Sequence, residues 1–406
     1  MQEGKKTTAV VAAAPQKSLQ VVKKDGYWGL VAARYTLVKR ILLIALILFI
    51  VFFMIFFSRA FTYDSLFSFF KDLQSVAAFV PSDYQTITAT YHEGSEAVLS
   101  YRGGVAFVNQ KGIEIYSPNG KRLLDVEESF AAPRAAASRK YLLAYDKGGN
   151  TFLVTSAYAK LYEGKTDFPI YGVALSDAGH FAIITGSDTA LSTVLVYDAN
   201  FNLIQRFSRA SATLDVALSA NGKRIALLGI NAENGQVYTK IDLFRLGDAS
   251  PESSAVLSGE VPLALSFTDN KHLAVLTDQA LHFASSDLEW DASYDIGDRA
   301  VIDFAVNADG VALVLEENAQ RAEQKVIAFD EDGKCFFEKT LTGNIKAVDL
   351  KEKRVFVLAD DRVACYDTKE ESEIIYTLTE PARDLFVIGS GGVRVIYQAK
   401  AEYIDF

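Results

Sequence analysis

The chain has 406 residues, of which 50% are hydrophobic and 12% aromatic, so it can bury a large core and is not a disordered protein. The net charge is −10, but residues 1–40 carry eight basic and two acidic side chains (+6), which leaves −16 for the remainder. An acidic main body argues against nucleic acid as a partner, because the phosphate backbone requires a basic surface.

Seventeen consecutive apolar residues, Ile41 to Phe57, follow the basic segment and include no charged or polar side chain. As a helix this run spans about 25 Å, which is close to the thickness of the hydrocarbon core of a bilayer. A buried helix of a globular domain has a polar side, and this run has none. We therefore predict a transmembrane helix over residues 41–58, with the lipid bilayer as its partner.

A cleavable signal peptide is the competing interpretation, since Ser58 and Ala60 are small residues spaced like a cleavage site. The apolar run is longer than a signal-peptide core, however, and forty residues precede it. Lys39 and Arg40 adjoin the start of the run, and basic residues stay on the cytoplasmic side of a membrane. The predicted topology is a single-pass protein of the cell membrane, with a basic cytoplasmic tail over residues 1–40 and an extracytoplasmic C-terminal part.

Residues 59–80 are expected to connect the membrane helix to the rest of the chain. Within them Leu66, Phe69, Leu73 and Val76 recur at helical spacing. This pattern predicts a short amphipathic connector helix. The alternative is that the membrane helix simply continues through these residues.

Beyond Pro81 the sequence changes to short apolar runs separated by turn residues, and one unit recurs. The unit is an apolar strand, a polar turn and a second, more strongly apolar strand, and its clearest copies occupy 173–185, 216–229, 264–277 and 304–316. The expected second strands are 36 to 48 residues apart and start at Val105, Tyr141, Phe181, Ile225, Leu273, Val311, Val355 and Val393. A period near forty that holds only strands is the length of a four-stranded propeller blade.

The last unit ends at Phe406 after its third strand. We expect residues 84–92 to supply the fourth strand, which would close the ring and pair two otherwise exposed edges. The count is then eight blades, with seven as the alternative if the degenerate first copy, residues 99–109, is not a blade. A two-sheet sandwich would not repeat one strand–turn–strand unit eight times. The predicted fold is therefore all-β, an eight-bladed β-propeller over residues 81–406 behind a single transmembrane helix.

The repeated units, such as VALSDAGHFAIIT at residues 173–185, resemble those of TolB/YVTN and WD40-like repeat propellers. The layout of basic tail, one helix, amphipathic connector and propeller also resembles a family of uncharacterised bacterial membrane-anchored proteins. This resemblance implies a location in the bacterial cell membrane and assigns no activity. The Trp-Asp dipeptide of true WD40 repeats occurs once, at Trp290 and Asp291.

Motifs that carry chemistry are missing from the sequence. It has no HExxH, GxSxG, P-loop or CxxC motif, and its four histidines lack metal-ligand spacing: His92, His180, His272 and His282. His180 and His272 occupy equivalent turn positions, where solvated side chains are expected. Glycines in these turns, such as Gly310, permit positive φ and do not indicate a phosphate or calcium site. We assign no catalytic, cofactor-binding or metal-binding residue.

Two carboxylates and two cysteines remain as candidates. Asp215 and Asp303 occupy matching first strands and are candidates for facing the central channel, although polar side chains there more often only solvate the channel. Cys335 and Cys365 fall in adjacent units, where we expect two small buried residues with free thiols rather than a disulfide.

The expected function is a non-catalytic binding or scaffolding module tethered to the membrane, with an envelope protein or cell-surface ligand as partner and no cofactor. The alternative is a metal-dependent hydrolase or lactonase with its site in the central channel. Acidic side chains clustered at the channel mouth would favour the enzyme, and an exposed apolar patch would favour a protein partner. A sensor that signals through the helix is a third hypothesis, although the tail has no recognisable effector domain.

Overall fold

The computed structural model describes residues 26–56, 71, 84–89, 95–389, 391–398 and 400–406, and the chain divides into two compact units, residues 1–61 and 62–406. Helix α1 (Gly26–Phe56) begins well before the predicted membrane segment, because residues 30–40 include good helix formers and neither Gly nor Pro. Among the described residues, no helix has the combined length and hydropathy of a membrane span. The expected connector helix, residues 59–80, lies outside the described residues except for Lys71.

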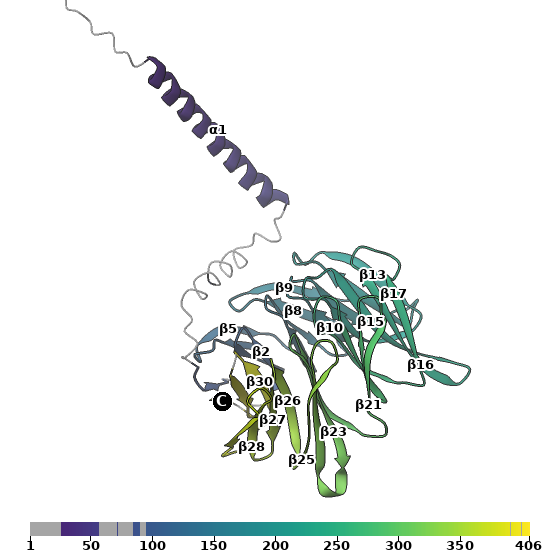
Figure 1. Cartoon of the computed structure of the whole chain (residues 1–406). Helices are drawn as coiled ribbons and strands as arrows, with labels where there is room; N and C mark the ends of the chain where they lie inside the picture. Colours follow the sequence, from purple (N-terminus) through teal and green to yellow (C-terminus); the bar gives the residue numbers. More distant parts are fainter. Residues whose placement is uncertain (1–25, 57–70, 72–83, 90–94, 390, 399) are drawn as a thin grey trace, which may run out of the picture. The chain divides into compact units, whose positions relative to one another are not determined.

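The second unit contains eight four-stranded antiparallel sheets, which confirms the predicted eight-bladed β-propeller (Figure 1). Each sheet forms one blade, numbered here in chain order from the inner strand outward. Blades 1 to 4 consist of β2 (Ser95–Tyr101), β3 (Gly104–Asn109), β4 (Gly112–Tyr116), β5 (Arg122–Glu127); β6 (Pro133–Ala137), β7 (Leu142–Asp146), β8 (Thr151–Thr155), β9 (Lys160–Lys165); β10 (Ile170–Leu175), β11 (Phe181–Thr185), β12 (Ser192–Tyr197), β13 (Leu203–Arg209); and β14 (Ala212–Leu218), β15 (Arg224–Glu233), β16 (Gln236–Arg245), β17 (Ser253–Ser258).

Blades 5 to 7 follow the same order, and blade 8 takes its outer strand from the N-terminal side of the propeller. These blades consist of β18 (Pro262–Phe267), β19 (Leu273–Thr277), β20 (Ala280–Ala284), β21 (Trp290–Asp295); β22 (Val301–Asn307), β23 (Gly310–Asn318), β24 (Glu323–Phe329), β25 (Cys335–Thr342), with a short 3₁₀ helix (Ala319–Arg321) between β23 and β24; β26 (Ile345–Lys351), β27 (Arg354–Ala359), β28 (Arg362–Asp367), β29 (Ser372–Thr377); and β30 (Asp384–Ile388), β31 (Gly392–Ile396), β32 (Lys400–Asp405), β1 (Ile87–Thr88).

Ring closure by the N-terminal strand is confirmed, in a shorter form than predicted. Strand β1 pairs antiparallel with β32, with Ile87 opposite Ala401 and Thr88 opposite Lys400. The paired residues fall within the expected segment, residues 84–92, of which residues 90–92 lie outside the described part of the chain. The closing sheet therefore joins two segments that lie more than 300 residues apart in the sequence.

Arg394, a fully buried residue of β31, reinforces this closure. Its guanidinium donates hydrogen bonds to the carbonyl oxygens of Gln85 (2.6 Å) and Pro118 (3.1 Å). The rings of Tyr84 and Tyr403, stacked with centroids 4.1 Å apart, lie within 6 Å of the guanidinium carbon. One buried cation thus ties together the N-terminal segment, blade 8 and the β4–β5 turn of blade 1.

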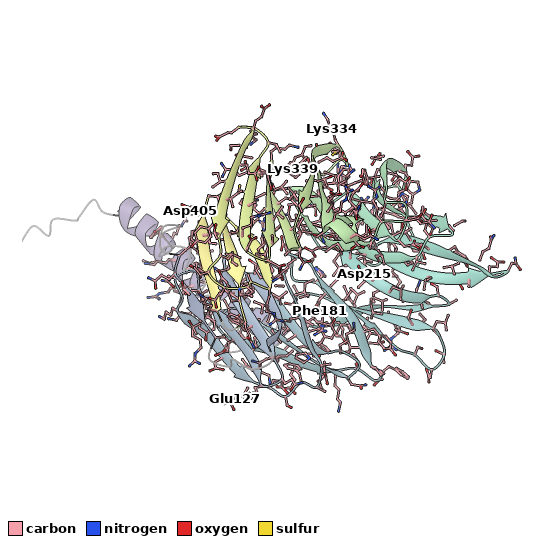
Figure 2. All side chains as sticks on the ribbon, turned by 90° about the horizontal axis from the view of Figure 1, so that it is seen from below. Glu127, Phe181, Asp215, Lys334, Lys339 and Asp405 are labelled. Carbon is pink, nitrogen blue, oxygen red and sulfur yellow. The ribbon has the colours of Figure 1, made fainter. Side chains whose placement is uncertain are left out.

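The core consists of apolar side chains packed between neighbouring blades. Strands in the middle of a blade, such as β11 and β12, are buried at every position, whereas the outermost strand β21 alternates between exposed and half-buried residues. Between blades 2 and 3, for example, Phe152 packs against Phe181 with ring centroids 6.0 Å apart. In Figure 2, Asp215 lies near the centre of the ring of blades and Glu127 toward its periphery. Burial on both faces explains why the expected second and third strands read as continuous apolar runs.

The glycine in the β22–β23 turn is required by its conformation. Gly310 has φ of +137°, and a Cβ atom there would lie 2.0 Å from the carbonyl oxygen of Phe329. No side chain fits at this distance, so the residue serves the turn, as the sequence predicted.

Candidate functional site

The inner strands of the propeller share an irregularity near their starts. In six of the eight, the pairing with the second strand shifts by one residue, which is a β-bulge. In blades 3 to 6 the bulged residue is large, apolar and exposed: Tyr171 (52%), Leu214 (50%), Leu263 (50%) and Ile302 (39%). We call these four residues the bulge ring. Because every inner strand begins at the same end of the channel, the bulge ring occupies one mouth of the propeller.

The segments around the bulge ring are predominantly acidic. At this end of blades 3 to 6 lie the connections into the inner strands and the turns between second and third strands. Five carboxylates and two guanidiniums occupy these segments, a balance of −3: Asp167, Asp188, Glu260, Asp278 and Asp298 against Arg299 and Arg321. The exposed apolar side chains are therefore framed by negative charge.

The two carboxylates expected at the channel link neighbouring blades. Asp215 accepts a hydrogen bond from the backbone N–H of Leu265, and Asp303 accepts one from the N–H of Val348, each at 2.8 Å. Each donor belongs to the inner strand of the next blade. Asp349, which the sequence analysis did not single out, accepts the equivalent bond from blade 8. These carboxylates thus hold adjacent inner strands together.

Burial perturbs the acidity of these carboxyl groups. Burial raises the pKa of Asp215 to about 6, and it also raises the pKa values of Asp303 and Asp349. For Asp384, burial and the nearby charges of Asp303 and Asp349 raise the pKa to about 6. Within the described ranges, no three His, Cys, Asp or Glu side chains are placed to hold a metal ion.

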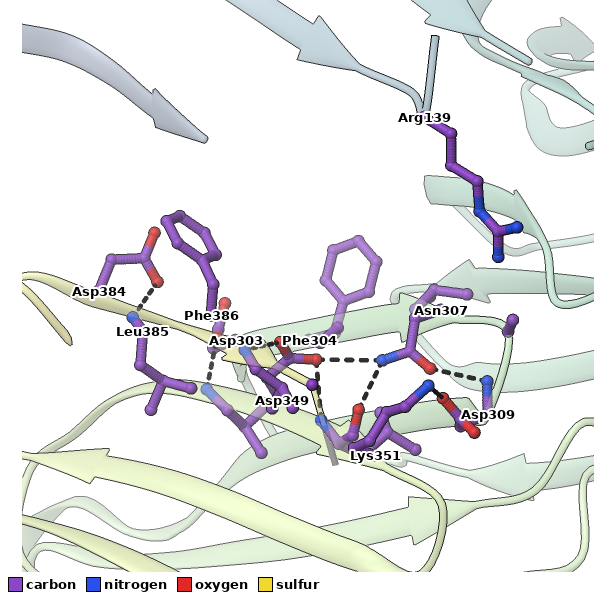
Figure 3. A pocket seen from close by; sticks show the side chains of 17 residues that line it. Arg139, Asp303, Phe304, Asn307, Asp309, Asp349, Lys351, Asp384, Leu385 and Phe386 are labelled. Carbon is purple, nitrogen blue, oxygen red and sulfur yellow. Dashed lines mark hydrogen bonds and ion pairs between the residues drawn. The ribbon is translucent and has the colours of Figure 1, made fainter. Parts of the chain in front are cut away.

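A cavity of about 600 Å³ occupies the channel beside blades 6 to 8 (Figure 3). Its wall consists of the inner strands β22, β26 and β30, with Arg139 from the β6–β7 turn. In Figure 3 the rings of Phe304 and Phe386 and the carboxyl group of Asp384 extend in the same direction. This volume is within the usual range for small-ligand sites.

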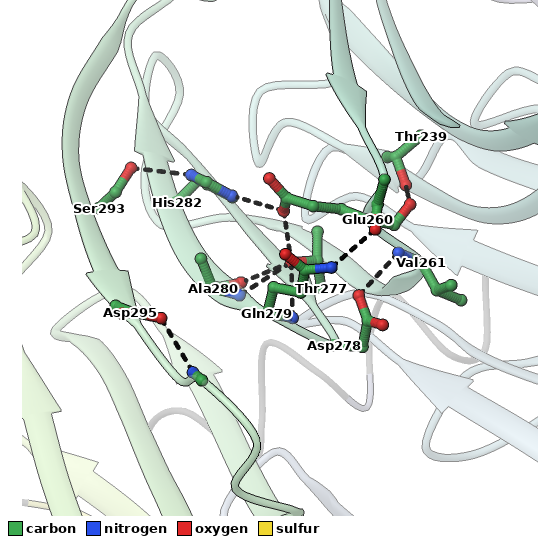
Figure 4. A network of polar contacts seen from close by, with 12 residues as sticks. Thr239, Glu260, Val261, Thr277, Asp278, Gln279, Ala280, His282, Ser293 and Asp295 are labelled. Carbon is green, nitrogen blue, oxygen red and sulfur yellow. Dashed lines mark hydrogen bonds and ion pairs between the residues drawn. The ribbon is translucent and has the colours of Figure 1, made fainter. Parts of the chain in front are cut away.

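A chain of hydrogen bonds in blade 5 includes a histidine that sequence reasoning had dismissed (Figure 4). His282, which is buried, contacts Glu260 through Nε2 (2.9 Å) and Ser293 through Nδ1 (2.8 Å). Glu260 also accepts a hydrogen bond from Thr277 (2.6 Å), and the imidazole packs against Trp290 at 5.0 Å between ring centroids. The order serine, histidine, carboxylate is that of nucleophilic hydrolases.

We interpret this chain as structural. Both ring nitrogens of His282 have partners, which a buried imidazole requires, and Glu260 anchors the connection between blades 4 and 5 to the hairpin of blade 5. Of these contacts, only the cross-strand contact of His282 with Ser293 could have been found from the sequence, and only if the β20–β21 register had been known.

The remaining histidines differ from expectation. His180 is half-buried rather than solvated, and burial lowers its pKa. His272 is also half-buried, with Nδ1 3.1 Å from a carboxylate oxygen of Asp269. The His180 ring lies against Gly222 in the β14–β15 turn of the next blade, which shields it from water. His92 lies outside the described residues.

Both cysteines carry free thiols, as predicted. Cys365 is buried in β28, but Cys335 is exposed, so the expectation that both are buried is wrong for Cys335. The reason is its position as the first residue of β25, the outermost strand of blade 6, where alternate residues face solvent.

The fold and the channel define the chain as an eight-bladed β-propeller. One mouth of its channel carries exposed apolar side chains surrounded by acidic residues. Residues 80–406 match the family of unknown function DUF5711, and the chain belongs to this family. No curated protein sequence matches it.

Solved structures with a similar fold share little sequence with the chain. They include BamB from Moraxella catarrhalis (11% identity, 80% of this chain and 100% of that one, TM-score 0.52) and Chaetomium thermophilum Sqt1 bound to the N-terminus of the ribosomal protein L10 (11%, 79% and 100%, 0.53). The WD40 domain of SCAP from fission yeast is similar at 8% identity (80% and 95%, 0.54). At these identities the similarity shows the fold alone.

Proposed function

We propose that this protein is a non-catalytic binding module that holds a protein partner at the bulge ring. The observation that carries the proposal is the repetition of a large, exposed apolar side chain at one bulge position in four consecutive blades. Scattered apolar residues are normal on a protein surface, but a set at equivalent positions around one channel mouth is typical of an interaction site.

The charge around the bulge ring selects the kind of partner. An excess of carboxylates at the rim favours association with positively charged segments and disfavours acidic ones. The partner that fits is a polypeptide segment with apolar side chains flanked by Lys or Arg. Sqt1, a propeller of the same fold class, was solved bound to the N-terminus of a ribosomal protein, which supports peptide recognition as a use of this fold.

We further propose that residues 41–58 tether the propeller to the bacterial cell membrane, with the propeller extracytoplasmic and the partner an envelope protein or cell-surface ligand. The support is the uninterrupted apolar run and the exposure of its side chains at successive positions of α1, including Leu42, Leu43 and Ile44. Apolar side chains exposed all around a helix are covered favourably by lipid.

The docking site is tested by charge insertion on the full-length protein. Leu214→Glu with Leu263→Glu places two carboxylates within an already acidic mouth and should abolish retention of the partner in cross-linked membranes. Ile375→Glu is the matched control, because Ile375 is equally exposed (53%) but lies on the outermost strand of blade 7. Equal loss with the control, or full retention with the double variant, would refute docking at the bulge ring.

The tether is tested separately by membrane fractionation and protease accessibility. The full chain should resist extraction from membranes at high pH, and protease added outside the inner membrane should digest the propeller. Recovery in the soluble fraction, or protection of the propeller with the cytoplasmic contents, would refute the tether and its topology without touching the docking proposal.

A further inference from the structure

The channel cavity beside blades 6 to 8 has an uneven distribution of charge. Four of its lining residues are acidic and two are basic, so the lining balances to −2: Asp303, Asp309, Asp349 and Asp384 against Arg139 and Lys351. Both cations are already paired. Lys351 contacts Asp309 at 2.8 Å, and Arg139 contacts Asp177 at 3.3 Å. The cavity therefore holds more negative charge than its own cations neutralise.

Asp384 accepts a single hydrogen bond, as Asp303 and Asp309 do, but its donor is the adjacent backbone N–H rather than a neighbouring blade or a lysine. Its Oδ1 accepts a hydrogen bond from the N–H of Leu385 at 2.8 Å. Its Oδ2 has no hydrogen-bond partner among the described residues, and the carboxyl group extends into the cavity (Figure 3). Asp349, in contrast, accepts three hydrogen bonds. A cationic donor would satisfy Asp384 without displacing an existing contact.

Two aromatic rings lie in the same cavity. Phe304 of β22 is 36% exposed, and Phe386 of β30 is half-buried. Both side chains line the cavity together with Asp384. The face of an aromatic ring attracts a cation, and its surface also covers an alkyl chain.

We propose that this cavity binds an organic cation: an ammonium or guanidinium group carried on an apolar chain. Asp384 receives the charged group, and Phe304 and Phe386 cover the apolar part. A bare metal ion is a poor fit, since the described residues hold no cluster of three metal-ligating side chains. The cation has two possible sources, a free amine or a Lys or Arg side chain of a bound polypeptide. The cavity shares no residue with the bulge ring, so this proposal goes beyond the docking function and is tested independently of it.

The test measures binding of hexylammonium to the full-length protein in nanodiscs by ligand-observed NMR, with hexanol and hexanoate as neutral and anionic analogues. Hexylammonium should bind at least tenfold more tightly than either analogue. Asp384→Asn keeps the oxygen that accepts from Leu385 but removes the charge, and it should weaken hexylammonium binding about tenfold. Phe304→Leu keeps the apolar bulk and should weaken it about threefold through loss of the ring.

Ile375→Glu is the control, because Ile375 lies on the outermost strand of blade 7 and belongs neither to the cavity nor to the bulge ring. It should leave hexylammonium binding unchanged. A second arm uses a short peptide with one central lysine between apolar residues. Tighter binding of the peptide than of the free amine, if Asp384→Asn weakens it, identifies a partner side chain as the source of the cation, because peptide bound only at the bulge ring would not respond to this substitution. Tighter binding of the free amine identifies a small ligand; either result supports the site. Equal binding of hexanoate, no binding of hexylammonium or the peptide, or full affinity in Asp384→Asn overturns the proposal.

Discussion

Replacing Arg394 by methionine should open the ring of blades at its closure. The interface between blades 8 and 1, where the ring closes, has the smallest apolar cluster. Among the described residues this cluster contains seven buried apolar side chains, whereas the clusters at the other interfaces contain ten to twelve. Strand β1 adds only two paired residues. The buried guanidinium is therefore expected to contribute a large share of the stability of this contact.

The magnitude follows from two opposing effects. Arg394 donates two charge-assisted hydrogen bonds, which contribute roughly 1.5–3 kcal/mol each. Burial of the cation lowers its pKa from 12.5 to about 10, which corresponds to a cost of about 3 kcal/mol. Methionine loses the hydrogen bonds and avoids the cost. The expected net loss is about 2 kcal/mol, a factor of roughly 30 in the opening equilibrium.

Hydrogen exchange measured by mass spectrometry on the full-length protein checks this value. Amides of β1 and β32 should exchange about 30-fold faster in Arg394→Met, and those of β14 and β15 should keep their rates, because local opening does not require unfolding of distant blades. Arg394→Lys, which keeps the burial cost of the charge but not both hydrogen bonds, should accelerate exchange by a similar factor. Unchanged exchange at β1, or equal acceleration in every blade, would show that Arg394 is not a clamp for the closure.

Three further predictions concern the channel, a turn and the serine–histidine pair. The folded-state pKa values of Asp215 and Asp384, about 6, exceed the ordinary 3.8, so the folded state binds more protons between these values. The free energy of unfolding should therefore rise by about 1.4 kcal/mol per carboxyl as pH falls from 7.5 to 5; denaturant titrations that show the opposite slope contradict this. Gly310→Ala should lower the free energy of unfolding by more than about 2 kcal/mol, since a Cβ there meets a backbone oxygen, and Gly148→Ala, with open space around it, should cost about half as much. A fluorophosphonate probe should not label Ser293; stoichiometric labelling would indicate an activated nucleophile and an enzyme.

The sequence predicted the blades well because of how they pack. Middle strands such as β11 and β19 are buried on both faces, so every residue except the threonine at the end of each strand is apolar. Each expected second strand starts within one residue of its observed start. Ring closure could be predicted because an unpaired edge is costly and one unassigned strand remained. Arg394 could not be predicted, since its partners are backbone carbonyl groups distant in sequence.

The candidate site was only partly predictable. Matching positions in the repeats singled out Asp215 and Asp303, but not that their partners lie in the next blade. From the sequence alone, Leu214 and Leu263 would be placed in the core. In the structure a bulge inserts one residue into each strand and reverses which side chains are buried, so both leucines are exposed. Asp384 is the first residue of its strand, where an acidic residue reads as part of a turn.

Photo-cross-linking in cells tests the central claim, docking at the bulge ring, most directly. A photoreactive amino acid would replace Leu214 in one sample and Ile375 in the other, since the two positions are similarly exposed. The account predicts a cross-link from position 214 to an envelope protein, mapped to a segment with apolar residues and net positive charge, and no such product from position 375. Identical products from both positions, or cross-links from position 214 to acidic segments, would contradict it.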